Sequence, residues 1–158
     1  MTATTATTAA AIKSTSNQSL IEPEQLISKA EAESLISESV AEGEKTEQKA
    51  VGMKQIFYDA INEDSKLFLQ VSITQQGFMK EGSSQTPEKI YQQLKSDQEN
   101  EIAVTGIGDD AMICTPGLHI LVDGYYLVIS AGNTSLEATR DIIKKAGALA
   151  VDNLKALE

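Results

Sequence analysis

The spacing of apolar and polar residues divides the chain into a polar N-terminal stretch and a longer region with regular hydrophobic periodicity. Residues 1–19 are mostly Thr, Ala and Ser, and Lys13 is the one charged side chain among them. Such a stretch buries too little apolar surface to offset the entropy lost on ordering, so we expect a disordered tether. Residues 20–157 carry the pattern of a single folded domain.

The first helix is predicted from residues around its N-terminus. Ser28 and Glu31 have the spacing of a capping box, and Ile27 and Ala32 have the spacing of a hydrophobic staple. We therefore expect a helix from about Lys29. Its predicted buried side chains are Ala32, Leu35 and Ile36.

Two further helices are predicted in the same way. Thr86 is a favourable N-cap, and Pro87 follows at the first helical position, where its missing amide hydrogen costs nothing. Thr134 and Glu137 form a second capping box, which predicts the start of a long C-terminal helix. Its apolar face is made largely of small residues, so we expect it to lie close on a sheet. This face consists of Leu136, Ile143, Ala146, Gly147, Ala150, Leu154 and Leu157.

Residues 51–61 and 66–76 are predicted to form two antiparallel strands, because the turn-forming cluster at 62–65 joins them. The second strand alternates, so we expect one buried face and one face mostly in water. The buried face has Leu67, Leu69, Val71 and Ile73, and the other has Phe68, Gln70, Ser72 and Thr74. The charged residues 38–50 show no such alternation, and we expect a solvated loop there.

Four short apolar segments near the C-terminus, EIAVT, AMIC, LHILV and YYLVISAG, predict an antiparallel meander. The turns between the last three are Thr115-Pro116-Gly117 and Asp123-Gly124, and Asp-Gly is a strong signal for a tight hairpin. The order α-β-β-α-β-β-β-β-α has no regular βαβ alternation. It predicts an α+β fold, with a mostly antiparallel sheet of about six strands and helices packed on it.

Composition narrows the classes of partner. The chain has 23 acidic and 13 basic residues, a formal charge of −10, no Trp and 4% aromatic residues. This balance disfavours nucleic acids and anionic lipid surfaces, and the stacking platforms of single-strand binders are missing. No apolar run is long enough for a membrane span, and no hydrophobic signal core precedes the domain.

The stretch TGIGDDAM, residues 105–112, contains the candidate metal ligands. If the turn after it centres on Pro116, Asp110 pairs with Val122, and Asp109 comes opposite Asp123. The three aspartates would then form a carboxylate cluster of the kind that holds Ca²⁺. The alternative is structural: the glycines supply turn conformations, and the aspartates bind local amides.

Cys114 and His119 are the only cysteine and the only histidine, which excludes an internal disulfide and multi-histidine metal sites. The same register places them on opposite faces of the sheet, so we expect no nucleophile-and-base pair. No catalytic residues and no cofactor are predicted.

Both faces of the final hairpin are apolar, so something must cover the second face. One predicted face has Cys114, Leu118, Ile120, Val122, Tyr125, Leu127 and Ile129, and the other has Ile113, His119, Leu121, Tyr126 and Val128. Three helices are available, so we expect a helix to cover it; the alternative is an interface with a partner or a second subunit, as in a homodimer.

The combination of VTGIGDDAMI, LHILVDGYYLVISAG and EATRDIIKKAGALAVDNL resembles the C-terminal half of small bacterial surface lipoproteins of unknown function. In those proteins a V-x-G-[IV]-G-D-x-A turn leads into a β-hairpin with a D/G-G tip, and a long helix closes the domain. LISKAEAESLI resembles the helix that opens them, so the likeness covers most of residues 20–157. The resemblance implies an antiparallel sheet with helices packed on it, similar to the PsbP-like sandwich, and it implies no reaction. This chain lacks the cysteine pair of many actinobacterial relatives.

These features predict a non-enzymatic, extracytoplasmic binding or interaction domain of lipoprotein type, held at the bacterial cell surface by a lipid anchor. The starting Met is expected to replace a removed signal peptide and lipidated cysteine, and the terminal Leu-Glu is typical of an expression-vector scar. The expected partner is a protein, a peptide or a cell-envelope component. The alternative is a small-ligand or Ca²⁺ module that uses Asp109, Asp110 and Asp123.

Overall fold

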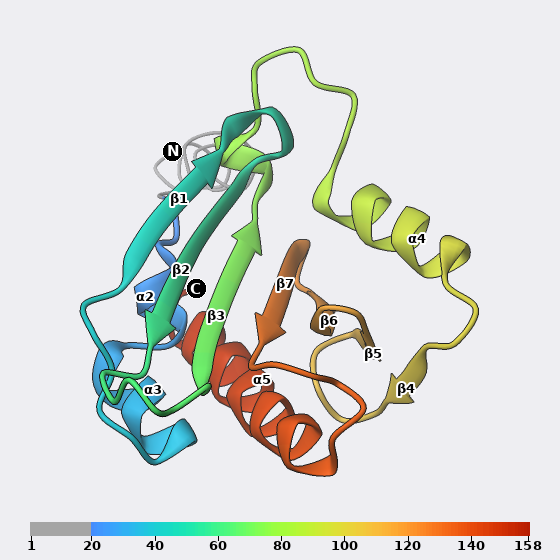
Figure 1. The fold of residues 1–158 in the computed structure, drawn as a ribbon. Coiled ribbons are helices and arrows are strands. Elements are labelled where there is room, and N and C mark those ends of the chain that lie inside the picture. Colours follow the sequence, from blue (N-terminus) through green and yellow to red (C-terminus); the bar gives the residue numbers. More distant parts are fainter. Residues whose placement is uncertain (1–19) are drawn as a thin grey trace.

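The computed structural model describes residues 20–158, and the predicted tether at residues 1–19 lies outside them. The described chain folds into one seven-stranded sheet in which all neighbouring strands are antiparallel, in the order β1-β2-β3-β7-β6-β5-β4 (Figure 1). The strands are β1 (Glu44–Gln48), β2 (Met53–Asp59), β3 (Phe68–Thr74), β4 (Ile102–Val104), β5 (Asp110–Cys114), β6 (Gly117–Val122) and β7 (Tyr125–Ser130). The helices are α2 (Pro23–Leu26), α3 (Lys29–Ile36), α4 (Pro87–Asp97) and α5 (Glu137–Leu157), with short 3₁₀ helices η1 (Lys49–Val51) and η2 (Gln76–Phe78).

The α+β class, the antiparallel sheet and the closing helix predicted from the sequence are confirmed. Helices α3 and α4 begin where their capping residues predicted, with Ser28 and Thr86 each accepting a hydrogen bond from the third helical amide. The Asp123-Gly124 hairpin is also confirmed, since Val122 pairs with Tyr125 and the two turn residues have φ of 50° and 85°. Within residues 20–158, no helix has the length and apolarity needed to cross a membrane.

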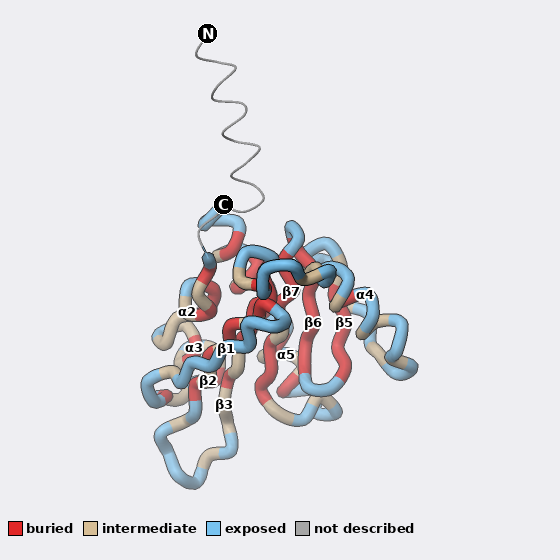
Figure 2. Tube along the Cα trace, turned by 90° about the horizontal axis from the view of Figure 1, so that it is seen from above, coloured by how far each residue is buried: buried red, intermediate tan, exposed pale blue. Residues whose placement is uncertain are grey.

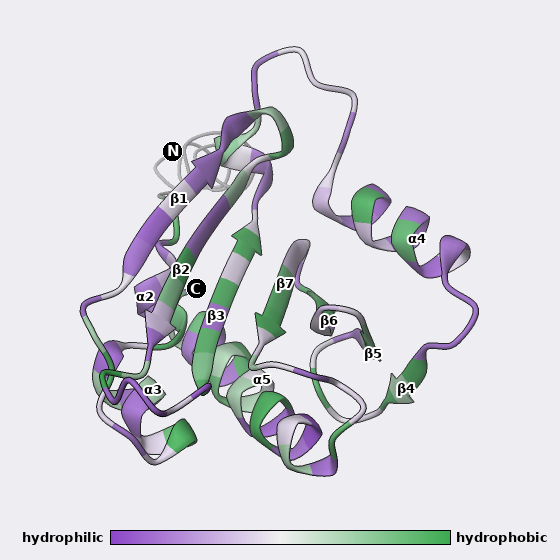
Figure 3. Ribbon diagram, viewed as in Figure 1, coloured by the Kyte–Doolittle hydropathy of each residue, from purple (hydrophilic) through white to green (hydrophobic). Residues whose placement is uncertain are grey.

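The loop predicted at residues 38–50 is wrong, because these residues include the edge strand β1. All five β1 residues are exposed, and the strand is held through its backbone pairing with β2 (Figure 2). It is almost wholly hydrophilic, whereas β7 in the middle of the sheet is mostly hydrophobic (Figure 3). An exposed edge strand needs no apolar face, and its charged side chains oppose pairing with other sheets. Hydrophobic periodicity therefore could not detect it.

The predicted capping box at Thr134 and Glu137 is also wrong, because α5 begins at Glu137 itself, with Leu136 as its N-cap. The residues before Glu137 form a loop. From within α5, the Arg140 guanidinium donates hydrogen bonds to the carbonyl oxygens of Thr134 and Ser135 in this loop, at 2.9 and 3.0 Å. Leu136 and Leu157 lie exposed at the two helix ends, whereas the middle of the predicted apolar face is buried.

The main core lies between the sheet and the helices α2, α3 and α5. It includes the alternate β3 residues Leu69, Val71 and Ile73, as the sequence predicted, whereas the other face of β3 is less open to water than predicted, since Ser72 and Thr74 are buried. Helix α5 approaches β6 closely at Gly147, where an added Cβ would stand 2.5 Å from Leu118 Cδ2. The glycine lets the helix lie this close to the sheet without displacing the Leu118 side chain.

Helix α4 covers the second face of the sheet over β6 and β7, on which it packs. Its buried ring is that of Tyr91, and Ile90 and Leu94 pack beside it. The helix lies beside β7, β6 and β5, away from β1 (Figure 1). The prediction that a helix covers this apolar face is confirmed.

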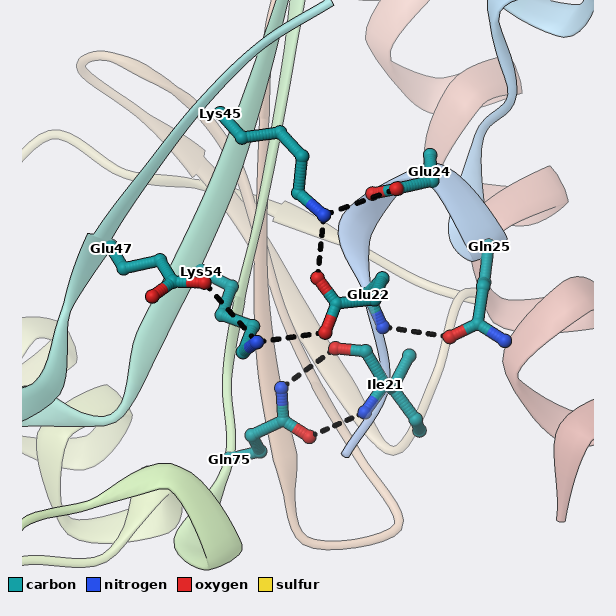
Figure 4. A network of polar contacts seen from close by, with 8 residues as sticks. All are labelled: Ile21, Glu22, Glu24, Gln25, Lys45, Glu47, Lys54 and Gln75. Carbon is teal, nitrogen blue, oxygen red and sulfur yellow. Dashed lines mark hydrogen bonds and ion pairs between the residues drawn. The ribbon is translucent and has the colours of Figure 1, made fainter. Parts of the chain in front are cut away.

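The start of the described chain is fastened to the sheet by a polar network (Figure 4). The Gln75 side chain bonds both backbone groups of Ile21, accepting from its amide at 2.9 Å and donating to its carbonyl at 2.8 Å. Glu22 accepts hydrogen bonds from Lys45 at 2.6 Å and from Lys54 at 2.7 Å. These contacts hold the point at which the predicted tether joins the domain.

The charges in this network stabilise one another. The ammonium groups of Lys45 and Lys54 lower the pKa of the Glu22 carboxyl, and the pKa values of both lysines are raised by their hydrogen bonds to it. Lys54 is 7% exposed and also pairs with Glu47 at 3.2 Å. A buried ammonium needs such partners, because leaving it unpaired out of water is costly.

Candidate binding groove

The register of the β5–β6 hairpin differs by one residue from the prediction. Thr115 and Pro116 alone form the turn, and Cys114 pairs with Gly117 as the first pair of the ladder. Gly117 begins β6 and leaves no room for a side chain, since an added Cβ there would stand 2.0 Å from the carbonyl oxygen of Ile129. A shift of one residue moves side chains to the opposite face of the sheet. The predicted face assignments of the β5 residues are therefore wrong.

Asp110 faces α4 instead of joining the other aspartates. Its Oδ2 lies 2.6 Å from Lys95 Nζ and accepts a hydrogen bond from the Tyr91 hydroxyl at 3.1 Å. These contacts, led by the one to Lys95, hold the pKa of the Asp110 carboxyl below its usual range. Asp110 thus fixes α4 to the sheet.

Asp109 and Asp123 do lie together at the end of the β6–β7 hairpin. The Asp109 carboxylate accepts a hydrogen bond from the Asp123 amide at 2.9 Å, and the Asp123 carboxylate lies 3.2 Å from Lys155 Nζ. Gly108 holds the preceding turn with φ of 65°, and an added Cβ would stand 2.6 Å from Ile120 Cγ2. This turn therefore has the features expected if the stretch is structural: a glycine in a turn conformation and an aspartate that binds a nearby backbone amide.

The predicted Ca²⁺ cluster is not assembled. Among residues 20–158, no group of three or more His, Cys, Asp or Glu side chains is placed to hold a metal ion. The physical reason is the register, which places Asp110 beside Lys95 and leaves Asp109 beside Asp123.

Cys114 and His119 lie on the same face of the sheet, contrary to the prediction, because His119 pairs with Met112, two residues before Cys114. His119 is 3% exposed, and its Nε2 lies 3.2 Å from the Cys114 carbonyl oxygen while its Nδ1 lies 2.7 Å from the Tyr126 hydroxyl. A carbonyl only accepts, so Nε2 carries the proton and Nδ1 accepts from Tyr126.

This arrangement does not activate the thiol. Both imidazole nitrogens already have partners other than the Cys114 sulfur, and burial lowers the pKa of His119. Burial also raises the pKa of the Cys114 thiol, whereas a nucleophilic cysteine requires a lowered one. The histidine therefore joins two strands of the sheet beneath α4.

A groove follows the end of the sheet at which β3 and β4 begin and β7 ends. It consists of two adjoining hollows of about 330 and 620 Å³ that share Thr115 and Thr134. We call them together the end groove. The smaller hollow, next to β3, is the β3 half, and the larger one, next to β4, is the β4 half.

The β3 half is lined by hydroxyl and carboxamide side chains beside apolar rings. The polar side chains are Gln70, Thr115, Ser130, Asn133 and Thr134. The rings are those of Phe68 and Pro116. All of these side chains are uncharged and supply hydrogen-bond donors, acceptors and apolar surface.

The hydroxyl of Ser130 is the most informative group in this half. Ser130 is 4% exposed, and its Oγ has no hydrogen-bond partner within residues 20–158. It stands directly opposite Gln70 in the β3–β7 pairing, so both side chains project from the same face of the sheet. A buried hydroxyl without a partner costs about 1–3 kcal/mol, and native proteins rarely keep one without a reason.

The β4 half is charged. Asp97 and Glu99 lie in its lining with Arg140, whose guanidinium is positioned by the carbonyl groups of the loop before α5. Cys114 also borders this half but is 8% exposed. The end groove therefore changes from neutral to charged along its length.

Sequence reasoning missed this groove because its residues come from separate segments at one end of the sheet. The one local signal is the polar run Gly132-Asn133-Thr134-Ser135 directly after an apolar strand. Thr134 in that run also has the spacing of a capping box, so the sequence predicts a helix cap there instead. No protein-family model matches the chain, and no curated protein and no solved structure is significantly similar to it.

Proposed function

We propose that the chain is a non-enzymatic binding domain of lipoprotein type, carried outside the cytoplasm on its N-terminal tether, with the end groove as its binding site. The observation that carries the proposal is the unpartnered, buried hydroxyl of Ser130 in a groove lined by donor and acceptor side chains. Ligand sites combine apolar walls with a few polar groups that fix orientation. The β3 half of the end groove has this composition.

The state of the reactive side chains supports a binding function over a catalytic one. The pKa of Cys114 is raised by burial, and both nitrogens of His119 are engaged in hydrogen bonds within the sheet. Asp110 is ion-paired with Lys95. General bases and nucleophiles need the opposite shifts or free access to a substrate.

The tether and the polar network at Glu22 support the lipoprotein part of the proposal. Residues 1–19 have the composition of a flexible linker. The network fastens Ile21 and Glu22 to the sheet directly after that linker. We propose a protein, a peptide or a cell-envelope component as its partner, because the formal charge of −10 disfavours nucleic acids.

The experiment is localisation of the full-length native protein. Fractions of the source cells are probed with an antibody to the domain, and intact cells are treated with a protease that cannot enter them. We expect the protein in the membrane fraction, cleaved from intact cells and labelled by a radioactive fatty acid. Recovery of an unlabelled, protease-protected protein in the cytosolic fraction would contradict the proposal.

A further inference from the structure

We infer that the β3 half of the end groove binds an uncharged, hydroxyl-rich ligand, a saccharide unit of a glycan chain. The inference rests on the proposed function, because it takes the end groove as the binding site and names the chemistry of its ligand. The carrying observations are the neutral lining of this half, the buried hydroxyl of Ser130 and the fixed aromatic ring of Phe68.

The lining favours an uncharged ligand over a charged one in this half. A charged group that entered it would lose water without meeting an opposite charge, and that loss is expensive. Hydroxyl and carboxamide groups both donate and accept hydrogen bonds, and sugar hydroxyls do the same. The chemistry of the lining therefore matches a polyol more closely than an acid or an amine.

Phe68 supplies the apolar part of the site. Its ring stacks on the ring of Phe57, with centroids 5.2 Å apart and planes inclined by 28°, so its orientation is set before any ligand arrives. The neighbouring Gln70 amide is also held, since its Nε2 donates to Gln55 Oε1 at 3.2 Å. A saccharide ring has C–H faces and hydroxyl edges, which fit a ring beside amide and hydroxyl groups. Groups fixed in advance lose little entropy on binding.

The position of the groove distinguishes a glycan from a peptide. Extended peptides bind by adding a strand to a sheet edge, where a row of free backbone groups pairs with them. The β3 half instead crosses the ends of the inner strands β3 and β7 and the turn at Thr115, so it offers no free strand edge. The volume of about 330 Å³ lies at the lower end of small-ligand sites, and the β4 half extends the groove for the rest of a chain.

Substitution of Ser130 separates a structural role from a binding role, because it should not destabilise the fold but should weaken binding of the ligand. Ser130→Ala removes a buried hydroxyl that has no partner in the described chain, so the folded protein should become no less stable. If the hydroxyl bonds the ligand, the same change should weaken binding about fivefold, which corresponds to one lost hydrogen bond. Ser96→Ala on the far side of α4, where Ser96 Oγ donates to the Gln93 carbonyl, is the matched control.

The experiment is a titration of the isotope-labelled full chain with neutral oligosaccharides, followed by amide NMR. The probes are chitohexaose, maltohexaose and cellopentaose at millimolar concentration. The competing class is represented by a hexapeptide of two Gly-Asn-Ala repeats, blocked at both termini so that it is uncharged. We expect saturable shifts at residues 68–70, 115 and 130–134 with at least one saccharide. Ser130→Ala should weaken that binding about fivefold, and Ser96→Ala should leave it unchanged.

Two results would overturn the inference. Saturable shifts at these residues with the hexapeptide and with none of the saccharides would replace the glycan by a peptide and leave the proposed binding function in place. Absence of shifts at these residues with every saccharide would also overturn it. The localisation of the native protein is measured separately, so failure of the glycan does not decide the lipoprotein proposal.

Discussion

The Nδ1 atom of His119 lies 2.7 Å from the Tyr126 hydroxyl, beneath α4 and away from water. The other ring nitrogen donates to the Cys114 carbonyl, so the neutral ring uses both of its nitrogens. A second proton on the ring would turn the acceptor Nδ1 into a donor. It would also place a positive charge in an apolar cluster beside Met112 and Leu121.

The first prediction is therefore a loss of stability in weak acid. Burial lowers the pKa of His119 in the folded protein below its ordinary value near 6.5, so between these two pKa values only the unfolded chain takes up the proton. The free energy of unfolding should fall as the pH decreases from 7.5 through about 6. Urea denaturation at several pH values measures this.

The chain has one histidine, which simplifies the interpretation. The neighbouring pair Lys95 and Asp110 stays ionised in this range, because the pKa of Lys95 is raised and that of Asp110 is lowered. A free energy of unfolding that stays constant or rises on acidification to pH 5.5 would contradict the prediction.

The second prediction concerns the attachment of α4. Asp110→Asn removes the ion pair with Lys95 and weakens the acceptor for Tyr91. The pair is partly exposed, so we expect a loss of only about 0.5–1 kcal/mol, together with faster hydrogen exchange confined to α4. Asp97→Asn on the same helix, where the carboxylate contacts Gln93, is the control and should leave exchange at the α4 core unchanged. Equal effects of the two variants would show that Asp110 does not fix the helix.

The third prediction is the absence of a calcium effect. The Asp123 carboxylate forms an ion pair with Lys155, Asp109 accepts a backbone hydrogen bond, and Asp110 forms an ion pair with Lys95. Addition of millimolar Ca²⁺ should shift neither the amide resonances of these aspartates nor the melting temperature. A saturable shift at all three aspartates would restore the calcium module predicted from the sequence.

The fourth prediction concerns the network at the start of the domain. Glu22→Gln removes two ion pairs and leaves the buried Lys54 with Glu47 alone. We expect a loss of about 1–2 kcal/mol in the free energy of unfolding, somewhat below the value of about 1.5–3 kcal/mol for a hydrogen bond to a charged group, because Glu22 and Lys45 are partly exposed to water. Glu42→Gln breaks the more exposed pair with Lys29 and should cost less than about 0.5 kcal/mol. Denaturant unfolding of both variants measures the difference.

The sequence predicted the elements whose signals are local. Alternation identified β3, the cap residues Ser28 and Thr86 located two helices, and Asp123-Gly124 located a hairpin. These features succeed because backbone geometry and side-chain spacing determine them within a few residues.

The remaining features depend on contacts between distant segments. β1 has no buried side chain, so only its pairing with β2 reveals it. The β5–β6 turn contains only Thr115 and Pro116, and Gly117 pairs with Cys114 at a place where it lies close to Ile129 of β7, a long-range contact that the turn sequence does not encode. The end groove depends on that register and on the loop before α5, and a one-residue error in the hairpin moves the β5 side chains Asp110 and Cys114 to the other face.

The central claim is that the end groove is the binding site of the domain, and site-specific photo-crosslinking in living source cells tests it most directly. A photoreactive residue is placed at Thr134, which borders both halves of the groove, or at Gln92 on the outward side of α4, in the full-length protein. We predict a discrete crosslinked species from position 134 that Ser130→Ala diminishes, and none from position 92. Crosslinks from position 92 without any from position 134 would contradict the account.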